Sequence, residues 1–93
     1  MESLDPVLSS PIRLAVVSTL IKVENADFMH LKSVTNATNG NLSHQIKKLQ
    51  EAEYVSVEKS FHKNYPKTTV ALTKKGRKAF EDYVETMKKF LHL

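Results

Sequence analysis

The sequence predicts an α+β fold that is mostly helical, with one two-stranded β-hairpin inserted between helices. Apolar residues recur at i, i+4 and i+7 from residue 42, and at i, i+3, i+4 and i+7 from residue 80. Both spacings place the apolar side chains on one face of a helix. Between these stretches, residues 54–61 and 68–72 alternate between apolar and polar, as half-buried strands do.

Size and composition limit the classes of protein that the chain can represent. Its 93 residues, 41% hydrophobic, suffice for one core, so we expect a single domain over residues 1–93. Cysteine is absent, which excludes disulfides, cysteine zinc sites and thiol catalysis. No apolar run reaches the roughly 18 residues of a membrane span, and the first residues do not resemble a signal peptide. We therefore expect a cytoplasmic protein.

Positive charge is concentrated in one part of the chain. The formal net charge is +4, but residues 44–78 hold nine basic residues against three acidic ones, a net +6. The remainder of the chain is slightly acidic. A basic segment of this kind favours a polyanionic partner.

The first helix is predicted over residues 12–23, opened by Pro11 after a short turn at Asp5-Pro6. At 100° per residue it has apolar side chains on two nearly opposite faces, one of which carries Leu14, Val17 and Ile21. A second subunit is the expected cover for that face. A helix enclosed on both sides within one chain is the alternative.

A short helix over residues 27–34 is expected next, with Asp27 as its cap and Phe28, Leu31 and Val34 on its inner face. Residues 35–41, which follow, are mostly turn-forming residue types and cannot easily continue a helix. Thr38 is a natural N-cap there, so a third helix is predicted to begin near Asn39.

In this third helix Leu42, Ile46 and Leu49 form the buried stripe, and the opposite face has no apolar residue. The hairpin that follows is expected to align Val55, Val57 and Phe61 with Val70 and Leu72, around a polar tip at residues 62–67. Thr73 is expected to cap a last helix that runs to about Phe90. Its length suggests that its far end packs on a partner.

This order of elements is the layout of a winged helix-turn-helix, with the helix-turn-helix at about 27–52, the wing at about 54–72 and a C-terminal dimerisation helix at about 73–91. In that layout the third helix enters the DNA major groove, which is about 12 Å wide and admits one α-helix. The wing reaches the flanking backbone or minor groove. The bare polar helix face and the hairpin lie within the basic segment.

Three stretches resemble the small winged-helix transcriptional regulators related to the MarR and ArsR groups: SSPIRLAVVSTL, TNGNLSHQIKKLQEAEYVSVEKSF and PKTTVALTKKGRKAFEDYV. The similarity covers roughly residues 5–91. It implies a homodimeric, non-enzymatic protein that binds double-stranded DNA at a pseudo-palindromic site. The family usually has Gly where Glu53 stands, so the turn from the third helix into the wing is expected to be capped differently.

Two sets of candidate DNA-binding residues follow. Asn41, Ser43, His44 and Lys47 are the candidates for base edges, and the lysines of the helix and wing are expected to meet phosphates. The recognition-helix set is Thr38, Asn39, Gly40, Asn41, Ser43, His44, Lys47 and Lys48. The wing set is Lys59, His62, Lys63, Asn64, Tyr65 and Lys67. The predicted dimer interface comprises Leu14, Val17, Ile21, Val84, Met87, Phe90 and Leu91.

Other functions have weaker support in the sequence. The four histidines lack metal-ligand spacing, and neither a catalytic constellation nor a phosphate-binding loop is present, so we expect no metal, no cofactor and no enzymatic activity. Nothing names a small-molecule effector. A protein-interaction module and an RNA-binding domain remain alternatives, because winged helices also serve as docking domains.

Overall fold

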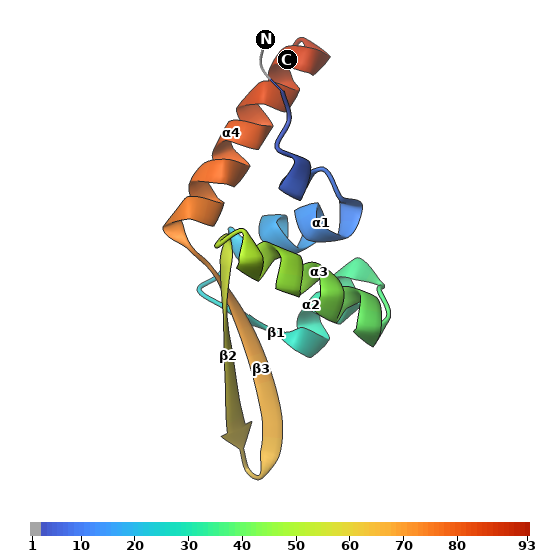
Figure 1. The fold of residues 1–93 in the computed structure, drawn as a ribbon, viewed down its shortest axis with the longest axis vertical. Helices are drawn as coiled ribbons and strands as arrows, with labels where there is room; N and C mark the ends of the chain where they lie inside the picture. Colours follow the sequence, from blue (N-terminus) through green and yellow to red (C-terminus); the bar gives the residue numbers. More distant parts are fainter. Residues whose placement is uncertain (1–2) are drawn as a thin grey trace.

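The computed structural model describes residues 3–93; Met1 and Glu2, the first two residues of the predicted domain, lie outside the described residues. Three helices, α1, α2 and α3, form a compact body, from which the β2–β3 hairpin and the end of α4 project in opposite directions (Figure 1). The molecule is therefore elongated, with extents of 50 × 25 × 21 Å. The elements are η1 (Pro6–Leu8), α1 (Pro11–Leu20), β1 (Ala26–Asp27), α2 (Phe28–Thr35), α3 (Asn39–Glu51), β2 (Val55–His62), β3 (Tyr65–Leu72) and α4 (Lys74–Leu91).

Side-chain caps begin the four α-helices. Ser10, Asp27, Thr38 and Thr73 each accept a hydrogen bond from the backbone N–H three residues later, which satisfies one of the donors that a helix start leaves unpaired. The predicted caps Asp27, Thr38 and Thr73 are thus confirmed, as is the start of α3 at Asn39. The short turn expected at Asp5-Pro6 is η1, in which Asp5 accepts from the N–H of Val7.

The core is a cluster of aliphatic side chains from η1, the helices and the base of the sheet. Its fully buried members are Leu8, Val16, Val17, Leu20, Leu31, Leu42, Leu49 and Val70. The predicted stripe of α3 is confirmed, because Leu42, Ile46 and Leu49 are all buried. Val17 is 0% exposed, so the protomer itself encloses this part of the second apolar face of α1. The prediction that Val17 lies at a subunit interface was therefore wrong.

Two other expectations about helices need correction. The first helix ends at Leu20 rather than Val23, and 3₁₀-type bonds from the N–H groups of Lys22 and Val23 tighten the chain as it turns toward β1. Val34 was expected on the inner face of α2, yet its side chain is 48% exposed. In a helix of only two turns, the i+6 position has already rotated away from the core.

The sheet is antiparallel, with strand order β1-β3-β2. Val55 pairs with Leu72 and Val57 with Val70, as the alternation predicted. The strands, however, extend to His62 and Tyr65, so the expected six-residue tip is only the turn Lys63-Asn64. Both of these residues have positive φ, as two-residue hairpin turns of type I′ require.

Phe61 continues the alternation but is 80% exposed, because the hairpin has left the body by this point. Pro66 is tolerated in β3 because its register opposite Phe61, one pair beyond the turn, directs its missing N–H away from β2. Strand β1, of two residues, was not predicted. It pairs with β3 at Ala26–Val70 and Asp27–Thr69 and joins the wing to the start of α2.

The junction between α3, the wing and α4 explains two features of the sequence. Glu53 has a φ of 65°, and the N–H groups of Glu53 and Tyr54 donate to the carbonyls of Gln50 and Leu49, which is the Schellman pattern. A non-glycine residue therefore occupies the left-handed position, where the family resemblance of the sequence implies Gly. Gly76 packs in the first turn of α4 directly against the Tyr54 carbonyl.

Candidate nucleic-acid interface

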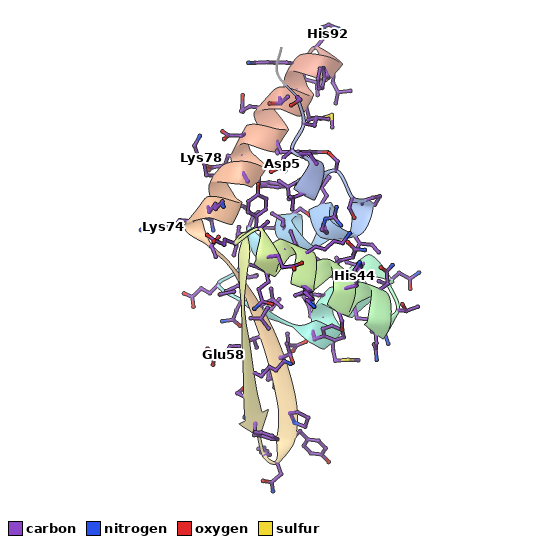
Figure 2. All side chains as sticks on the ribbon, in the orientation of Figure 1. Asp5, His44, Glu58, Lys74, Lys78 and His92 are labelled. Atoms are coloured by element: carbon purple, nitrogen blue, oxygen red, sulfur yellow. The ribbon has the colours of Figure 1, made fainter. Side chains whose placement is uncertain are left out.

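The eight predicted recognition-helix residues lie at the N-cap and along the exposed part of α3. All of them are exposed, from the N-cap at Thr38 through Lys48, while the opposite face of α3 is buried against the body. Figure 2 shows His44 on this outward side of α3, away from Lys74 and Lys78 at the start of α4. The exposure of these residues agrees with the polar face that the sequence predicts for α3.

The first turn of α3 is built to expose its backbone. Asn36 ends α2 in the left-handed conformation, and the Asn41 N–H donates to Thr38 Oγ1 at 3.1 Å. At Gly40, an added Cβ would meet nothing within 4 Å, so protein packing gives no reason for glycine there. Open space at a positive helix end is suited to the close approach of an anion.

A groove of about 450 Å³ lies between α3 and the wing. Ser43 and Lys47 line it from α3, and Lys59 lines it from β2. Glu58, the acidic residue beside Lys59, is on the opposite side of the wing, facing away from α3 (Figure 2). The alternation of β2 therefore directs a cation toward the groove and a carboxylate away from it.

The other wing residues do not line that groove. His62, Lys63, Tyr65 and Lys67 line a second groove, of about 490 Å³, between the wing and the start of α2. Phe28 and Met29 contribute apolar side chains to it. Asn64 lines neither groove and lies in the tip turn. The predicted wing set is fully exposed but is thus divided between two surfaces.

Four basic residues lie at the start of α4, Lys74, Lys75, Arg77 and Lys78, and two of them form ion pairs within the protein. Lys78 Nζ is 2.8 Å from Asp82 Oδ1, and this hydrogen bond raises the pKa of Lys78. Lys75 Nζ lies 4.0 Å from Glu53 Oε2 and above the Tyr54 ring. Lys75 therefore belongs to the junction of α3, the wing and α4, and Lys78 pairs within α4 itself.

Two polar residues behind α3 were not among the predicted site residues. Arg13 donates from Nε to the Val7 carbonyl at 2.6 Å and from Nη1 to Gln45 Oε1. Gln45 in turn donates from Nε2 to Asn41 Oδ1 at 3.0 Å. The i, i+4 spacing of Asn41 and Gln45 was visible in the sequence, whereas the contact between residues 13 and 45 was not.

One further polar contact ties the N-terminal segment to the body. Tyr54 donates its hydroxyl to Asp5 Oδ2. Burial raises the pKa of Tyr54 to about 12, with the hydrogen bond and negative charge of Asp5 as further causes. Within residues 3–93, no three side chains of His, Asp or Glu gather as a metal site would require. No helix in that range is long and apolar enough to span a membrane.

Residues 12–91 match the family model described as a winged helix DNA-binding domain. The chain belongs to this family. An uncharacterized protein of Methanocaldococcus jannaschii is 38% identical over 78 residues, covering 84% of this chain and 85% of that protein.

Solved structures agree with the winged-helix fold. A transcriptional regulator homologue from Pyrococcus horikoshii OT3 superposes with a TM-score of 0.85 at 26% identity, covering 92% of this chain and 85% of that one. A MarR-family transcriptional regulator from Silicibacter pomeroyi gives a TM-score of 0.73 at 22% identity, covering 89% and 54%. The predicted α+β winged-helix class is confirmed by these structures.

Proposed function

We propose that the chain is a sequence-specific regulator of transcription that binds double-stranded DNA as a homodimer. The observation that carries the proposal is the groove in which Ser43 and Lys47 of α3 meet Lys59 of the wing. Helix α3 enters the major groove, and the wing follows the flanking backbone or minor groove. Among residues 3–93, no acidic side chain lines the groove between α3 and the wing, which favours a polyanion there.

Two kinds of contact are proposed for this surface. The phosphate contacts come from flexible ammonium groups, which position a protein on DNA without reading sequence. They are assigned to Lys47, Lys48, Lys59, Lys63 and Lys67, with the exposed α3 start at Thr38, Asn39 and Gly40. The base contacts come from Asn41, Ser43, His44 and Lys47, whose exposed side chains offer donors and acceptors to base edges. His62, Asn64 and Tyr65 complete the proposed wing contacts near the tip.

Substitutions should separate these two roles. Asn41→Ala or His44→Ala is expected to reduce the preference between DNA sequences, because base contacts are lost. Lys63→Ala is expected to weaken all duplexes alike, because it removes a phosphate contact. The measurement is selection of duplexes from a random library, with affinities of selected and scrambled sites by fluorescence anisotropy. Equal losses for both classes of variant on every duplex would remove the claim of base reading.

The end of α4 supports the proposed dimer. Phe90 and Leu91 are 53% and 57% exposed, and Val84 and Met87 on the same helix are half-buried. Leu14 of α1 and Ile21 at its C-cap are also half-buried and remain in the proposed interface, whereas Val17 does not. Large apolar side chains at an outward helix end favour burial against a second copy. To bind successive major grooves on one face of DNA, the dimer must hold its two α3 helices about 34 Å apart, one turn of the duplex.

A substitution that places a negative charge in the proposed interface tests the dimer. Leu91→Glu should shift the protein to monomers in analytical ultracentrifugation and weaken binding to a two-half-site duplex. Val23→Glu provides the matched control, because Val23 is 45% exposed but lies outside the proposed interface. A wild-type protein that sediments as a monomer at micromolar concentration would contradict the dimer.

RNA binding is the second candidate, and one observation favours it. Phe61 and Tyr65 near the wing tip are 80% and 76% exposed, and aromatic side chains of this kind stack on unpaired bases. Competition between duplex DNA and structured RNA distinguishes the two functions. Displacement of bound DNA by RNA at lower concentration than by unlabelled DNA would favour RNA as the partner.

A further inference from the structure

Three polar side chains form a hydrogen-bonded row that runs from α1 to the exposed surface of α3. Arg13 on α1 is half-buried, Gln45 on the inner flank of α3 is half-buried, and Asn41 one turn earlier is exposed. The hydrogen bonds that join them are Arg13 Nη1 to Gln45 Oε1 and Gln45 Nε2 to Asn41 Oδ1. This hydrogen-bonded row therefore links a half-buried cation to a candidate base contact.

The chemistry of arginine sets the direction of both hydrogen bonds in this row. A guanidinium group can only donate, so the oxygen of the Gln45 amide must face Arg13. The nitrogen of that amide must then face Asn41, where it can only donate. As a result, the Asn41 amide is oriented with its oxygen toward Gln45 and its nitrogen directed elsewhere.

Arg13 is itself held in place from behind. Its Nε donates to the Val7 carbonyl at 2.6 Å, next to the fully buried Leu8. The backbone of Asn41 is fixed as well, because its N–H donates to the N-cap Thr38 at 3.1 Å. An asparagine whose backbone and amide oxygen are both anchored has lost the freedom to exchange its donor and acceptor positions.

We infer that Arg13 and Gln45 are positioning residues for sequence recognition: they orient the Asn41 amide so that its Nδ2 group faces a hydrogen-bond acceptor on a base edge. The inference rests on the proposed binding of duplex DNA. In the major groove, the acceptors that such a group can meet are N7 and O6 of guanine, N7 of adenine and O4 of thymine. The base opposite Asn41 is thus chosen partly by a residue on α1 that does not touch DNA.

The substitution Gln45→Glu tests the direction of the hydrogen bonds in this row. The introduced carboxylate still pairs with Arg13, so the fold is retained, but it cannot donate to Asn41. The Asn41 amide is then expected to rotate and to donate to that carboxylate, which leaves its oxygen facing the DNA. At the base pair that Asn41→Ala identifies, the preference should fall from about fivefold to below twofold or change toward a base that offers a donor.

Two further variants separate positioning from other effects. Gln50→Glu adds the same charge to α3, where Gln50 is exposed and lines the groove to the wing, and is expected to lower the affinity for all duplexes without changing the preference at the Asn41 base pair. Gln45→Met removes both hydrogen bonds without adding charge and should relax the preference at the same base pair. In the Asn41→Ala background, Gln45→Met should have no further effect on preference, because the group through which it acts is gone.

The readout is the base preference at each position of the site, obtained by sequencing duplexes that remain bound. A Gln45→Glu or Gln45→Met protein that melts like wild type and keeps the wild-type preference at the Asn41 base pair would overturn the inference and leave the proposed function intact. A change that persists in the Asn41→Ala background would overturn it too, since Gln45 would then act on DNA directly. A wild-type protein that binds no duplex would overturn both.

Discussion

The two glycines of the chain allow a test in which similar substitutions have opposite effects on stability. At Gly76 an added Cβ would lie 2.1 Å from the Tyr54 carbonyl oxygen, 2.9 Å from the Tyr54 carbonyl carbon and 2.8 Å from Leu72 Cδ1. Ordinary contacts begin at 3.4 Å, so α4 must move away from the turn by more than an ångström. Because the Tyr54 atoms belong to backbone, no side-chain rotation can relieve the clash.

The magnitude follows from what that movement disrupts. Overpacking costs about 1–3 kcal/mol. Displacement of α4 also strains the bonds of Thr73 to the carbonyls of Tyr54 and Glu53, at 3.0 and 2.7 Å, each contributing about 1 kcal/mol. Alanine recovers about 1 kcal/mol of helix propensity over glycine. We expect Gly76→Ala to lower the free energy of unfolding by about 2 kcal/mol, which in a chain of this size lowers the Tm by roughly 10 °C.

Gly40→Ala is the matched control. Nothing lies within 4 Å of the position its Cβ would take, so the fold should gain about 0.5 kcal/mol from the better helix former, while DNA affinity should fall if a phosphate approaches the α3 backbone there. Both variants are compared by urea unfolding followed by circular dichroism, at one protomer concentration because dimerisation contributes to stability. A Gly76→Ala protein as stable as wild type would refute the packing argument.

Two further predictions concern the same junction. Glu53→Gly should raise the free energy of unfolding by up to about 1 kcal/mol in urea unfolding, because a left-handed residue with φ of 65° loses its Cβ clash; an unchanged or lower stability would contradict this. Tyr54 should make stability fall as pH rises from about 10 toward about 12, because its raised pKa favours the protonated hydroxyl in the folded protein. Its stabilisation is complete below the unfolded pKa of 10.0 and is lost as pH passes the folded value. Tyr54→Phe should remove that part of the pH dependence, and parallel curves for the two proteins would disprove the assignment.

Local patterns in the sequence were sufficient to predict the main elements. Thr38 with Leu42, Ile46 and Leu49 defines both the start and the buried face of α3, because caps and helical periodicity are short-range properties. The alternation of apolar and polar residues between Val55 and Leu72 likewise predicts the register of the hairpin. For the same reason, the candidate DNA-contacting residues fell on one helix face and one hairpin.

Features that depend on contacts distant in sequence could not be predicted in this way. Strand β1 has only two residues and exists because it pairs with β3, more than 40 residues later. The burial of Val17 depends on packing within the protomer, which a helical wheel does not distinguish from packing on a second subunit. The contact from Arg13 to Gln45 spans 32 positions and uses residue types common on helix surfaces.

The salt dependence of duplex binding tests the proposed function most directly. Each protomer offers five lysines as phosphate contacts, Lys47, Lys48, Lys59, Lys63 and Lys67, all exposed, and a dimer offers twice as many. If roughly half of them engage, the logarithm of the association constant should fall against the logarithm of salt concentration with a slope of about −4 to −5. Fluorescence anisotropy of a labelled duplex between about 50 and 200 mM salt measures this slope. A value in that range supports a DNA-binding dimer, and a slope near zero would contradict it.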